Sequence, residues 1–430
     1  MNMIPYVNRP APFAWDVAAA IFGATGLGGG LYDPSALDTL FQDANGTTPA
    51  LPGDPVRLVL DARQELGPEL SDVLTQSLVL ATGTRSGNGW NITTTSVSTA
   101  GVRQPGTWQT GKLYRYSVAW SGNANGRTIR FAIAGNVIVL GNGESGNVAG
   151  VVPAGASGNV DLYSTSSVGD TFYFEIGSIK EVINPPLSQP TAAARPTLLD
   201  VSGNLGLRFD LVDDALTTVL PQAITGDILI AGTGGTIIEP FSGDTLTIGP
   251  TTYTGGTPGL FHALGDIVGM VLIDRTLSAT ERRLLVAYYK GKGAKGLLVE
   301  GPEKIVNGDF SDGLDGWSVT SEGTGSVSVS DGRAIITSTN GSNYGAITQS
   351  VPIEEGSTYL LSFDNSGPTG SYVQFTNVTS FNGPIGTTRT VRRAAATGNS
   401  PFLLRVAGNS GTVSFDNISF RELRAQEDWT

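Results

Sequence analysis

Residues 113–120 read Leu-Tyr-Arg-Tyr-Ser-Val-Ala-Trp, and this stretch indicates the fold class. Every second side chain is large and apolar, which is the period of a β-strand with one face in a core. Similar alternating runs occupy residues 128–134, 137–140 and 171–176, and Gly, Asn and Ser turns separate them. The sequence between residues 67 and 182 therefore predicts an all-β module.

The composition of the whole chain agrees with a β protein and excludes several kinds of site. The 430 residues include 58 Gly, no Cys and one His, and 15% are charged. Disulfides, thiol nucleophiles and Cys-based zinc sites are therefore excluded, and a lone histidine, His262, cannot build a multi-His metal site. With 26 Lys and Arg against 38 Asp and Glu, the net charge of −12 disfavours a nucleic-acid partner. No stretch approaches ~18 uninterrupted apolar residues, so membrane insertion is not expected.

Two helices are predicted outside this module. Ser278-Ala-Thr-Glu281 is a capping box, in which the hydroxyl and the carboxylate each accept a hydrogen bond from an open backbone N–H. The helix that follows has an apolar stripe and ends at Lys290-Gly291; the stripe comprises Leu284, Leu285, Tyr288 and Tyr289. A shorter helix is expected over residues 33–41, with Asp33 as its cap.

A second all-β stretch, residues 301–423, repeats the first. The two spans are 116 and 123 residues long, which suits a sandwich of about eight or nine strands each. Four anchors recur in the same order: Gly67-Pro68-Glu69 with Gly301-Pro302-Glu303, Trp90 with Trp317, residues 112–118 with 357–363, and residues 174–182 with 415–423. We expect Trp90 and Trp317 to lie in the two cores.

The second module also resembles a known family. Its opening, Asn307-Gly308-Asp309-Phe310 and then Gly316-Trp317, and its closing Phe415-Asp416-Asn417-Ile418-Ser419 resemble the jelly-roll carbohydrate-binding modules of glycoside hydrolases. In that family the two segments lie together, often around a structural calcium. The resemblance implies Asp309 and Asp416 as calcium ligands, and the alternative is that both acids only cap turns. The first module departs from this pattern, with Glu69-Leu70-Ser71-Asp72 at its opening.

The flanks of the first module resemble a recurrent phage and prophage virion protein. The matching text covers residues 30–61 and 187–296, with Leu211 where that family commonly has Gly. The family usually folds as a concanavalin-A-like sandwich. The resemblance implies a mainly β, multidomain β-sandwich (jelly-roll) chain with few short helices, divided into an N-terminal attachment arm (1–30), a split concanavalin-A-like sandwich (31–66 plus 187–299), an inserted jelly roll (67–186) and a C-terminal jelly roll (300–430). The arm residues expected to dock onto the particle are Tyr6, Phe13, Trp15, Ile21 and Phe22.

Glycan-binding residues are predicted from what a sugar needs. An aromatic ring stacks on the apolar face of a pyranose, while amides, carboxylates and arginines bond its hydroxyls. The candidates are Trp108 with Arg103, in a predicted loop of the first module, and Asn343, Tyr344, Tyr372 and Gln374 in the second. The alternative is that these aromatic residues are ordinary half-buried strand residues.

Together these patterns predict a virion surface protein, a spike, fibre or decoration, that binds bacterial cell-surface glycans without catalysis. The expected partners are other virion proteins, bacterial surface polysaccharide and further copies of the chain in a homo-oligomer. His262 stands in no catalytic motif and the acids are scattered, so we expect no enzyme activity and no required cofactor beyond a structural calcium. Two alternatives stay open: a purely structural virion protein, and a glycan depolymerase or secreted glycan-binding accessory protein.

Overall fold

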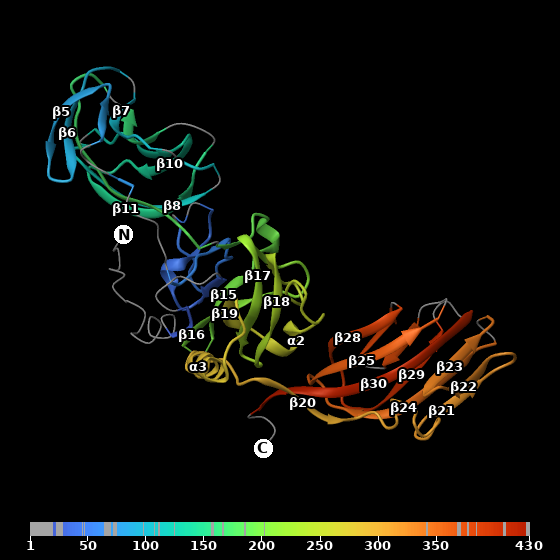
Figure 1. The fold of residues 1–430 in the computed structure, drawn as a ribbon. Helices are drawn as coiled ribbons and strands as arrows, with labels where there is room; N and C mark the ends of the chain where they lie inside the picture. The colour runs from blue at the N-terminus through green and yellow to red at the C-terminus, as the bar shows by residue number, and fades with distance from the viewer. Residues whose placement is uncertain are drawn as a thin grey trace. The chain divides into compact units, whose positions relative to one another are not determined.

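The computed structural model describes residues 20–22 and 29–426, except 45, 47, 64–69, 72–74, 98, 107, 111, 124, 156–158, 166, 185, 202, 341–342, 368–370, 376–377, 384 and 407–409. Tyr6, Phe13 and Trp15 lie outside these residues, as does the anchor Gly67-Pro68-Glu69. The chain divides into two compact units, residues 1–200, 215–224 and 271–274, and residues 201–214, 225–270 and 275–430. Strands dominate the described chain, which confirms the mainly β fold class (Figure 1). Within the described residues, no helix is long and apolar enough to cross a membrane.

Strands from before residue 67 and after residue 186 form one nine-stranded sheet. Its order is β15-β16-β19-β17-β14-β3-β2, with β1 beside β19 and β18 beside β17. The strands are β1 (Gly29–Tyr32), β2 (Leu40–Phe41), β3 (Leu58–Val59), β14 (Leu187–Ser188), β15 (Thr197–Val201), β16 (Asn204–Arg208), β17 (Leu216–Gly232), β18 (Thr236–Ile248) and β19 (Ile267–Ile273). The strands between residues 77 and 181 form two sheets of their own. They are inserted in the sequence between β3 and β14, but no described strand among them pairs with the nine-stranded sheet.

The helix with the capping box is present as α3 (Ala279–Lys290). The Ser278 hydroxyl accepts a hydrogen bond from the Glu281 backbone N–H, and the Glu281 carboxylate accepts one from the Ser278 N–H at 2.8 Å. Leu285, Tyr288 and Tyr289 are buried, as the apolar stripe predicts. A second, short helix, α2 (Phe261–Leu264), precedes β19.

The helix predicted over residues 33–41 is wrong. Asp33 does not cap it either: its carboxylate accepts a hydrogen bond from the Ser35 N–H at 2.9 Å in a local turn, and the residue at the cap position is Ala36, which makes no side-chain capping bond. Only one 3-10 turn, η1 (Leu37–Thr39), forms before the chain enters β2. Leu40 pairs there with Val59 of β3, so strand pairing overrides the local helical pattern.

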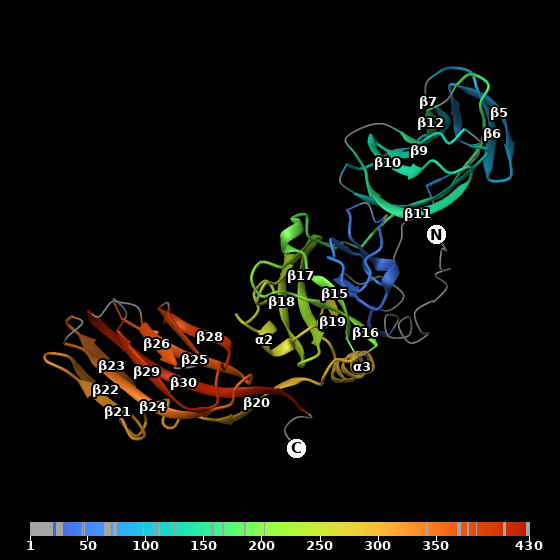
Figure 2. The same ribbon diagram turned by 180° about the vertical axis from the view of Figure 1, so that it is seen from behind.

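The inserted module is a sandwich of two five-stranded sheets, ordered β10-β9-β12-β7-β4 and β11-β8-β13-β6-β5. Figure 2 shows β9, β10 and β12 in one layer and β6 and β11 in the other. Its strands are β4 (Ser77–Val79), β5 (Ala81–Ser86), β6 (Gly89–Thr94), β7 (Thr99–Gln104), β8 (Leu113–Ser121), β9 (Ile129–Ile133), β10 (Asn136–Gly141), β11 (Gly146–Pro153), β12 (Val160–Thr165) and β13 (Thr171–Glu181). The apolar face of β8 lies in the core, where the Tyr116 ring stacks on Phe131 with centroids 4.5 Å apart.

The C-terminal module repeats this topology strand for strand. Its sheets are ordered β27-β26-β29-β24-β21 and β28-β25-β30-β23-β22, so β21 to β30 correspond in turn to β4 to β13. The strands are β21 (Ser318–Ser321), β22 (Ser326–Ser330), β23 (Arg333–Ser338), β24 (Gly345–Ile353), β25 (Thr358–Ser366), β26 (Ser371–Phe375), β27 (Thr379–Gly383), β28 (Gly386–Arg393), β29 (Gly398–Val406) and β30 (Gly411–Ala425); β20 (Leu298–Glu303) pairs with β30. The identical order supports the duplication expected from the sequence.

One anchor of the repeat is confirmed in detail and another is wrong. Tyr114 and Tyr359 occupy corresponding strands, and each hydroxyl accepts a hydrogen bond from the backbone N–H five residues earlier, at 3.1 and 2.9 Å. Trp90 and Trp317 do pack against the two cores. They are not equivalent, because Trp90 lies within β6 whereas Trp317 precedes β21 and donates its indole N–H to the Asn307 carbonyl.

Two of the predicted arm residues belong to the chain's own core. Ile21 and Phe22 are 1% and 2% exposed. The Arg63 guanidinium lies 3.9 Å from the centre of the Phe22 ring and is ion-paired with Asp61 at 2.6 Å. Because their surface is already buried, Ile21 and Phe22 are not available for docking onto a particle, which corrects the prediction for these two residues.

Candidate functional site

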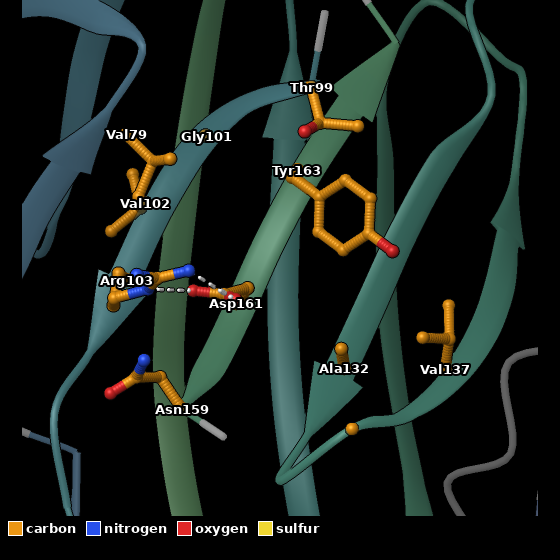
Figure 3. Close-up of a pocket in the computed structure, with 11 residues that line it drawn as sticks. Val79, Thr99, Gly101, Val102, Arg103, Ala132, Val137, Asn159, Asp161 and Tyr163 are labelled. Carbon is orange, nitrogen blue, oxygen red and sulfur yellow. Dashed lines mark hydrogen bonds and ion pairs between the residues drawn. The ribbon is translucent and has the colours of Figure 1, made fainter. Parts of the chain in front are cut away.

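A hollow of about 340 Å³ lies on the outer face of the β10-β9-β12-β7-β4 sheet in the inserted module. Alternation along β12 creates it, because Val160 and Leu162 are buried in the core while Asp161 and Tyr163, which alternate with them, face outward. We name it the Tyr163 hollow; its lining includes Val79, Thr99, Gly101, Arg103, Ala132, Val137, Asn159, Asp161 and Tyr163 (Figure 3). A volume of this size is within the range of small-ligand pockets.

The register of the sheet sorts the outward residues into two rows. In the first row, Arg103 of β7 pairs with Asp161 of β12, which pairs with Ala132 of β9. In the second row, Gly101 of β7 pairs with Tyr163. Residues directly opposite in antiparallel strands have Cβ atoms ~5 Å apart, so each row is a line of neighbouring side chains.

An ion pair forms one wall of the hollow. Arg103 donates two hydrogen bonds to Asp161, from Nε to Oδ1 at 2.6 Å and from Nη2 to Oδ2 at 3.0 Å. The hydrogen bond with Asp161 raises the pKa of Arg103. The side chains keep 38% and 21% of their surface exposed, so the pair still offers N–H donors and carboxylate lone pairs to a ligand.

Tyr163 supplies the aromatic surface of the hollow. Figure 3 shows its ring between Thr99 on one side and Ala132 and Val137 on the other. The side chain is half-buried, so part of the ring is accessible. Gly101 lets the backbones approach here, because a Cβ at that position would lie 2.2 Å from the Leu162 carbonyl oxygen. An accessible ring beside a fixed polar pair is the arrangement that stacks a sugar and bonds its hydroxyls.

The structure brings one predicted residue of the inserted module to this site and places the other elsewhere. Arg103 lines the hollow. Trp108 is half-buried, packs against the core and meets the Tyr114 ring edge-to-face at 5.4 Å, as the alternative interpretation expects. Sequence reasoning missed Asp161 and Tyr163. The signal was present in Val-Asp-Leu-Tyr (160–163), where a carboxylate and an aromatic ring alternate with core residues.

In the C-terminal module, Asn343 and Tyr344 precede β24. The Asn343 side chain holds a turn together, because its Oδ1 accepts a hydrogen bond from the Thr324 N–H at 3.2 Å and its Nδ2 donates to Asn340. The Tyr344 hydroxyl lies 3.5 Å from a Glu322 carboxylate oxygen. Asn343 thus has a structural role in the described turn.

Tyr372 and Gln374 lie in β26, in the sheet that corresponds to the one bearing the hollow. They flank Val373, which is buried in the core. The register pairs Gln374 with Leu403 and Tyr372 with Arg405 of β29. In the inserted module the corresponding middle strands pair Tyr163 with Arg130. Both modules therefore place a tyrosine opposite an arginine on these strands, with the two residue types exchanged.

The predicted calcium ligands have protein partners. The opening and closing segments do lie together, because the Ile418 N–H donates to the Gly308 carbonyl at 2.9 Å. The Asp309 carboxylate accepts hydrogen bonds from the N–H and hydroxyl of Ser311, and these lower its pKa. Asp416 is ion-paired with Arg333 at 3.2 Å. This geometry matches the alternative of turn capping and ion pairing, and calcium binding by the two acids stays a prediction.

Three acids after β16 form another cluster. Oxygens of Asp210, Asp213 and Asp214 all lie within 4.8 Å of one another. The Asp210 carboxylate accepts hydrogen bonds from three backbone N–H groups that follow it, so the cluster is a self-capped turn. Leu211 within this turn has a φ of +64°, the conformation in which glycine is favoured.

Comparisons with known proteins identify one region. Residues 302–392 match the family described as carbohydrate binding domain. The C-terminal module thus has a carbohydrate-binding type of domain, and glycan binding is the function this indicates. The match covers a part of the chain only. No curated protein matches the chain.

Solved structures that are similar to parts of the chain include a cellulose-binding domain and a phage tailspike domain. The second N-terminal cellulose-binding domain of Cellulomonas fimi β-1,4-glucanase C shares 20% identity, over 28% of this chain and 94% of that one, with a TM-score of 0.23. The enzymatically active domain of bacteriophage CBA120 tailspike protein 4 shares 14% identity over 28% of this chain, with a TM-score of 0.24. The chain spans 21% of that tailspike domain. TM-scores this low carry no argument about function.

Proposed function

We propose that this chain is a non-catalytic glycan-binding protein of the surface of a phage or phage-like particle, where it promotes adhesion to the bacterial host. The observation that carries the glycan-binding part is the Tyr163 hollow. There a partly exposed ring stands beside the bidentate Arg103–Asp161 pair on one face of a sheet. The family match of residues 302–392 supports the same activity for the C-terminal module.

Binding would work through stacking and hydroxyl recognition. The ring of Tyr163 covers the apolar face of one sugar, and the Arg103–Asp161 pair bonds its hydroxyls. One such site is weak, because few groups contact the ligand. Several copies on one particle can raise the apparent affinity by ~10²–10⁴ when the geometry allows simultaneous contact. Oligomerisation and other virion proteins are therefore part of this proposal.

The virion location rests on the resemblance of residues 30–61 and 187–296. The test is removal of residues 1–19, which spares the buried Ile21 and Phe22. We expect the shortened chain to keep its glycan affinity and to be lost from particles. Incorporation at the normal level would contradict a docking role for residues 1–19.

The non-catalytic part of the proposal rests on the chemistry of the hollow. A glycosidase of the usual kind needs two carboxyl groups ~5–9.5 Å apart across the scissile bond. Asp161, the carboxylate in the lining, is held by Arg103. His262 lies in α2, outside the lining, and burial lowers its pKa. An assay of reducing ends tests this point, because a depolymerase would release them from the bound polysaccharide.

The experiment that tests the binding site is a calorimetric titration of the full chain with host capsular or cell-wall polysaccharide. Tyr163→Ala removes the stacking surface and should weaken binding by about tenfold, because stacking contributes ~1 kcal/mol or slightly more. Tyr173→Ala is the matched control, since Tyr173 lies in β13 of the other sheet of the same module. Equal affinities of the two variants would contradict the site.

A further inference from the structure

The second outward row of the inserted module continues past Tyr163 to an arginine. Arg130 of β9 pairs with Tyr163 on one side and with Val139 of β10 on the other. Val139 is 64% exposed, whereas Arg130 is half-buried against the sheet. The row therefore presents an aromatic ring, a guanidinium and an apolar side chain in succession.

Arg130 differs from the other arginines of this module whose contacts are known. Arg103 is bound to Asp161, Arg127 lies 3.5 Å from Asp170, and Arg85 stands over the Trp90 ring at 5.1 Å. Across the part of the chain that the structure describes, the Arg130 side chain makes no hydrogen bond, ion pair or ring contact. Its charge thus has no ion-pair partner among the described residues, in a chain whose net charge is −12.

We propose that the inserted module binds an acidic polysaccharide, in which Tyr163 stacks on a uronic acid and Arg130 binds its carboxylate. This inference rests on the proposed glycan binding and adds the class of glycan. Neighbouring strands are ~4.8 Å apart, so a ring stacked on Tyr163 holds its carboxylate within reach of the long Arg130 side chain. The planar guanidinium donates two parallel hydrogen bonds to a carboxylate.

The same geometry selects against neutral sugars. A neutral ring stacked on Tyr163 would cover part of Arg130 without giving its donors a charged acceptor, and such a loss of hydration is unfavourable. Arg103 is less suited to this role, because its Nε and Nη2 already bind the Asp161 carboxylate, which compensates its charge. The C-terminal module also pairs an arginine with a tyrosine, Arg405 with Tyr372, so the duplication keeps the two residue types together.

The test compares one polymer in two charge states. Polygalacturonate, hyaluronate and alginate together contain four uronic acids, and chemical reduction of their carboxyl groups gives neutral polymers of the same backbone. We expect the full chain to bind at least one acidic polymer about tenfold or more tighter than its reduced form, the usual worth of a charged hydrogen-bonded pair. Arg130→Gln should weaken binding of the acidic polymer, should not weaken binding of the reduced one, and should thereby remove the difference between the two affinities.

Two further variants sharpen the result. Arg85→Gln removes the same charge from the other sheet of the module and should not change binding. Arg130→Lys should recover only part of the affinity, because an ammonium lacks the two-pronged geometry. Full recovery by lysine, or equally tight binding of dextran sulfate through Arg130, would overturn carboxylate recognition in favour of charge alone.

The failures are distinguishable. If Tyr163→Ala weakens binding to acidic and reduced polymers alike while Arg130→Gln has no effect, the acidic-glycan inference is wrong and the proposed function stands. If no acidic polymer binds but a neutral host glycan does, the inference is again wrong. If no polysaccharide binds at all, both the inference and the proposed function are wrong.

Discussion

Replacing Gly101 by alanine perturbs the Tyr163 hollow without removing any side chain from it. Gly101 lies in β7 directly opposite Tyr163. A Cβ added there would lie 2.2 Å from the Leu162 carbonyl oxygen and 2.7 Å from the Tyr163 Cα. Ordinary contact begins at 3.4 Å, so the neighbouring strand must move by about 1.2 Å, the difference between 3.4 and 2.2 Å.

The cost of this movement can be estimated. Forcing an extra carbon into a closely packed place costs ~1–3 kcal/mol. A glycine-to-alanine change returns ~0.4–1 kcal/mol by restricting the unfolded chain. The free energy of unfolding of the inserted module should therefore fall by ~1–2 kcal/mol. Because the movement displaces the backbone of Tyr163, glycan affinity should fall by about tenfold as stacking is lost.

Hydrogen exchange read by mass spectrometry is the suitable assay, because it reports β7 and β12 separately from the rest of the chain. Glycan titration of the same variant measures the effect on the site. Gly143→Ala is the matched control, since the nearest atom to a Cβ there is the Ser145 carbonyl oxygen at 3.4 Å. Faster exchange of β7 and β12 with weaker binding is expected for Gly101→Ala alone. If the two variants behave alike in both assays, the close approach of the strands does not control the site.

The remaining predictions concern stability and the excluded candidate. Glu303→Ala should destabilise the C-terminal module by ~2–4 kcal/mol in exchange experiments, because the carboxylate accepts the Phe420 N–H at 2.8 Å, among other donors. Burial raises the pKa of Glu303 but its hydrogen bonds outweigh this, so the pKa is lowered. The stability that Glu303 contributes is therefore fully present above the pKa of the unfolded chain, 4.5, and is lost as the pH falls through the lower pKa of the folded chain. Glu303→Gln should lose this pH dependence, and a free energy of unfolding that falls at low pH as in the native chain would contradict the prediction. Leu211→Asn should raise the free energy of unfolding by up to ~1 kcal/mol, because asparagine adopts a positive φ at a lower cost than leucine; a decrease would refute the reasoning. Trp108→Phe should leave glycan affinity unchanged in titrations, since Trp108 packs on Tyr114; a loss would restore it as a ligand residue.

The features that sequence predicts well here are local. The alternation in residues 113–120 requires one face in a core, and β8 follows it closely. The Ser278 capping box fixes where α3 begins, because its two hydrogen bonds join residues three apart. The order of the anchors was enough to predict the duplication, although the match of Trp90 with Trp317 was wrong within it.

The residues of the candidate site could not be predicted from any short stretch of the sequence. Arg103, Asp161 and Tyr163 meet because strands far apart in sequence pair in one register, which no short motif specifies. Trp108 was favoured as a ligand because glycines surround it, but its apolar surface packs against the core. Strand pairing of Leu40 likewise overrides the helix expected from its neighbours.

The measurement that tests the central claim most directly is a titration of the full chain and of Tyr163→Ala with host surface polysaccharide, with reducing ends assayed in the same samples. The account predicts saturable binding by the native chain, about tenfold weaker binding by the variant, and no release of reducing ends from either. Absence of binding, or equal binding by the two proteins, would contradict the Tyr163 hollow as the glycan site. Release of reducing ends by the native chain would contradict the non-catalytic function.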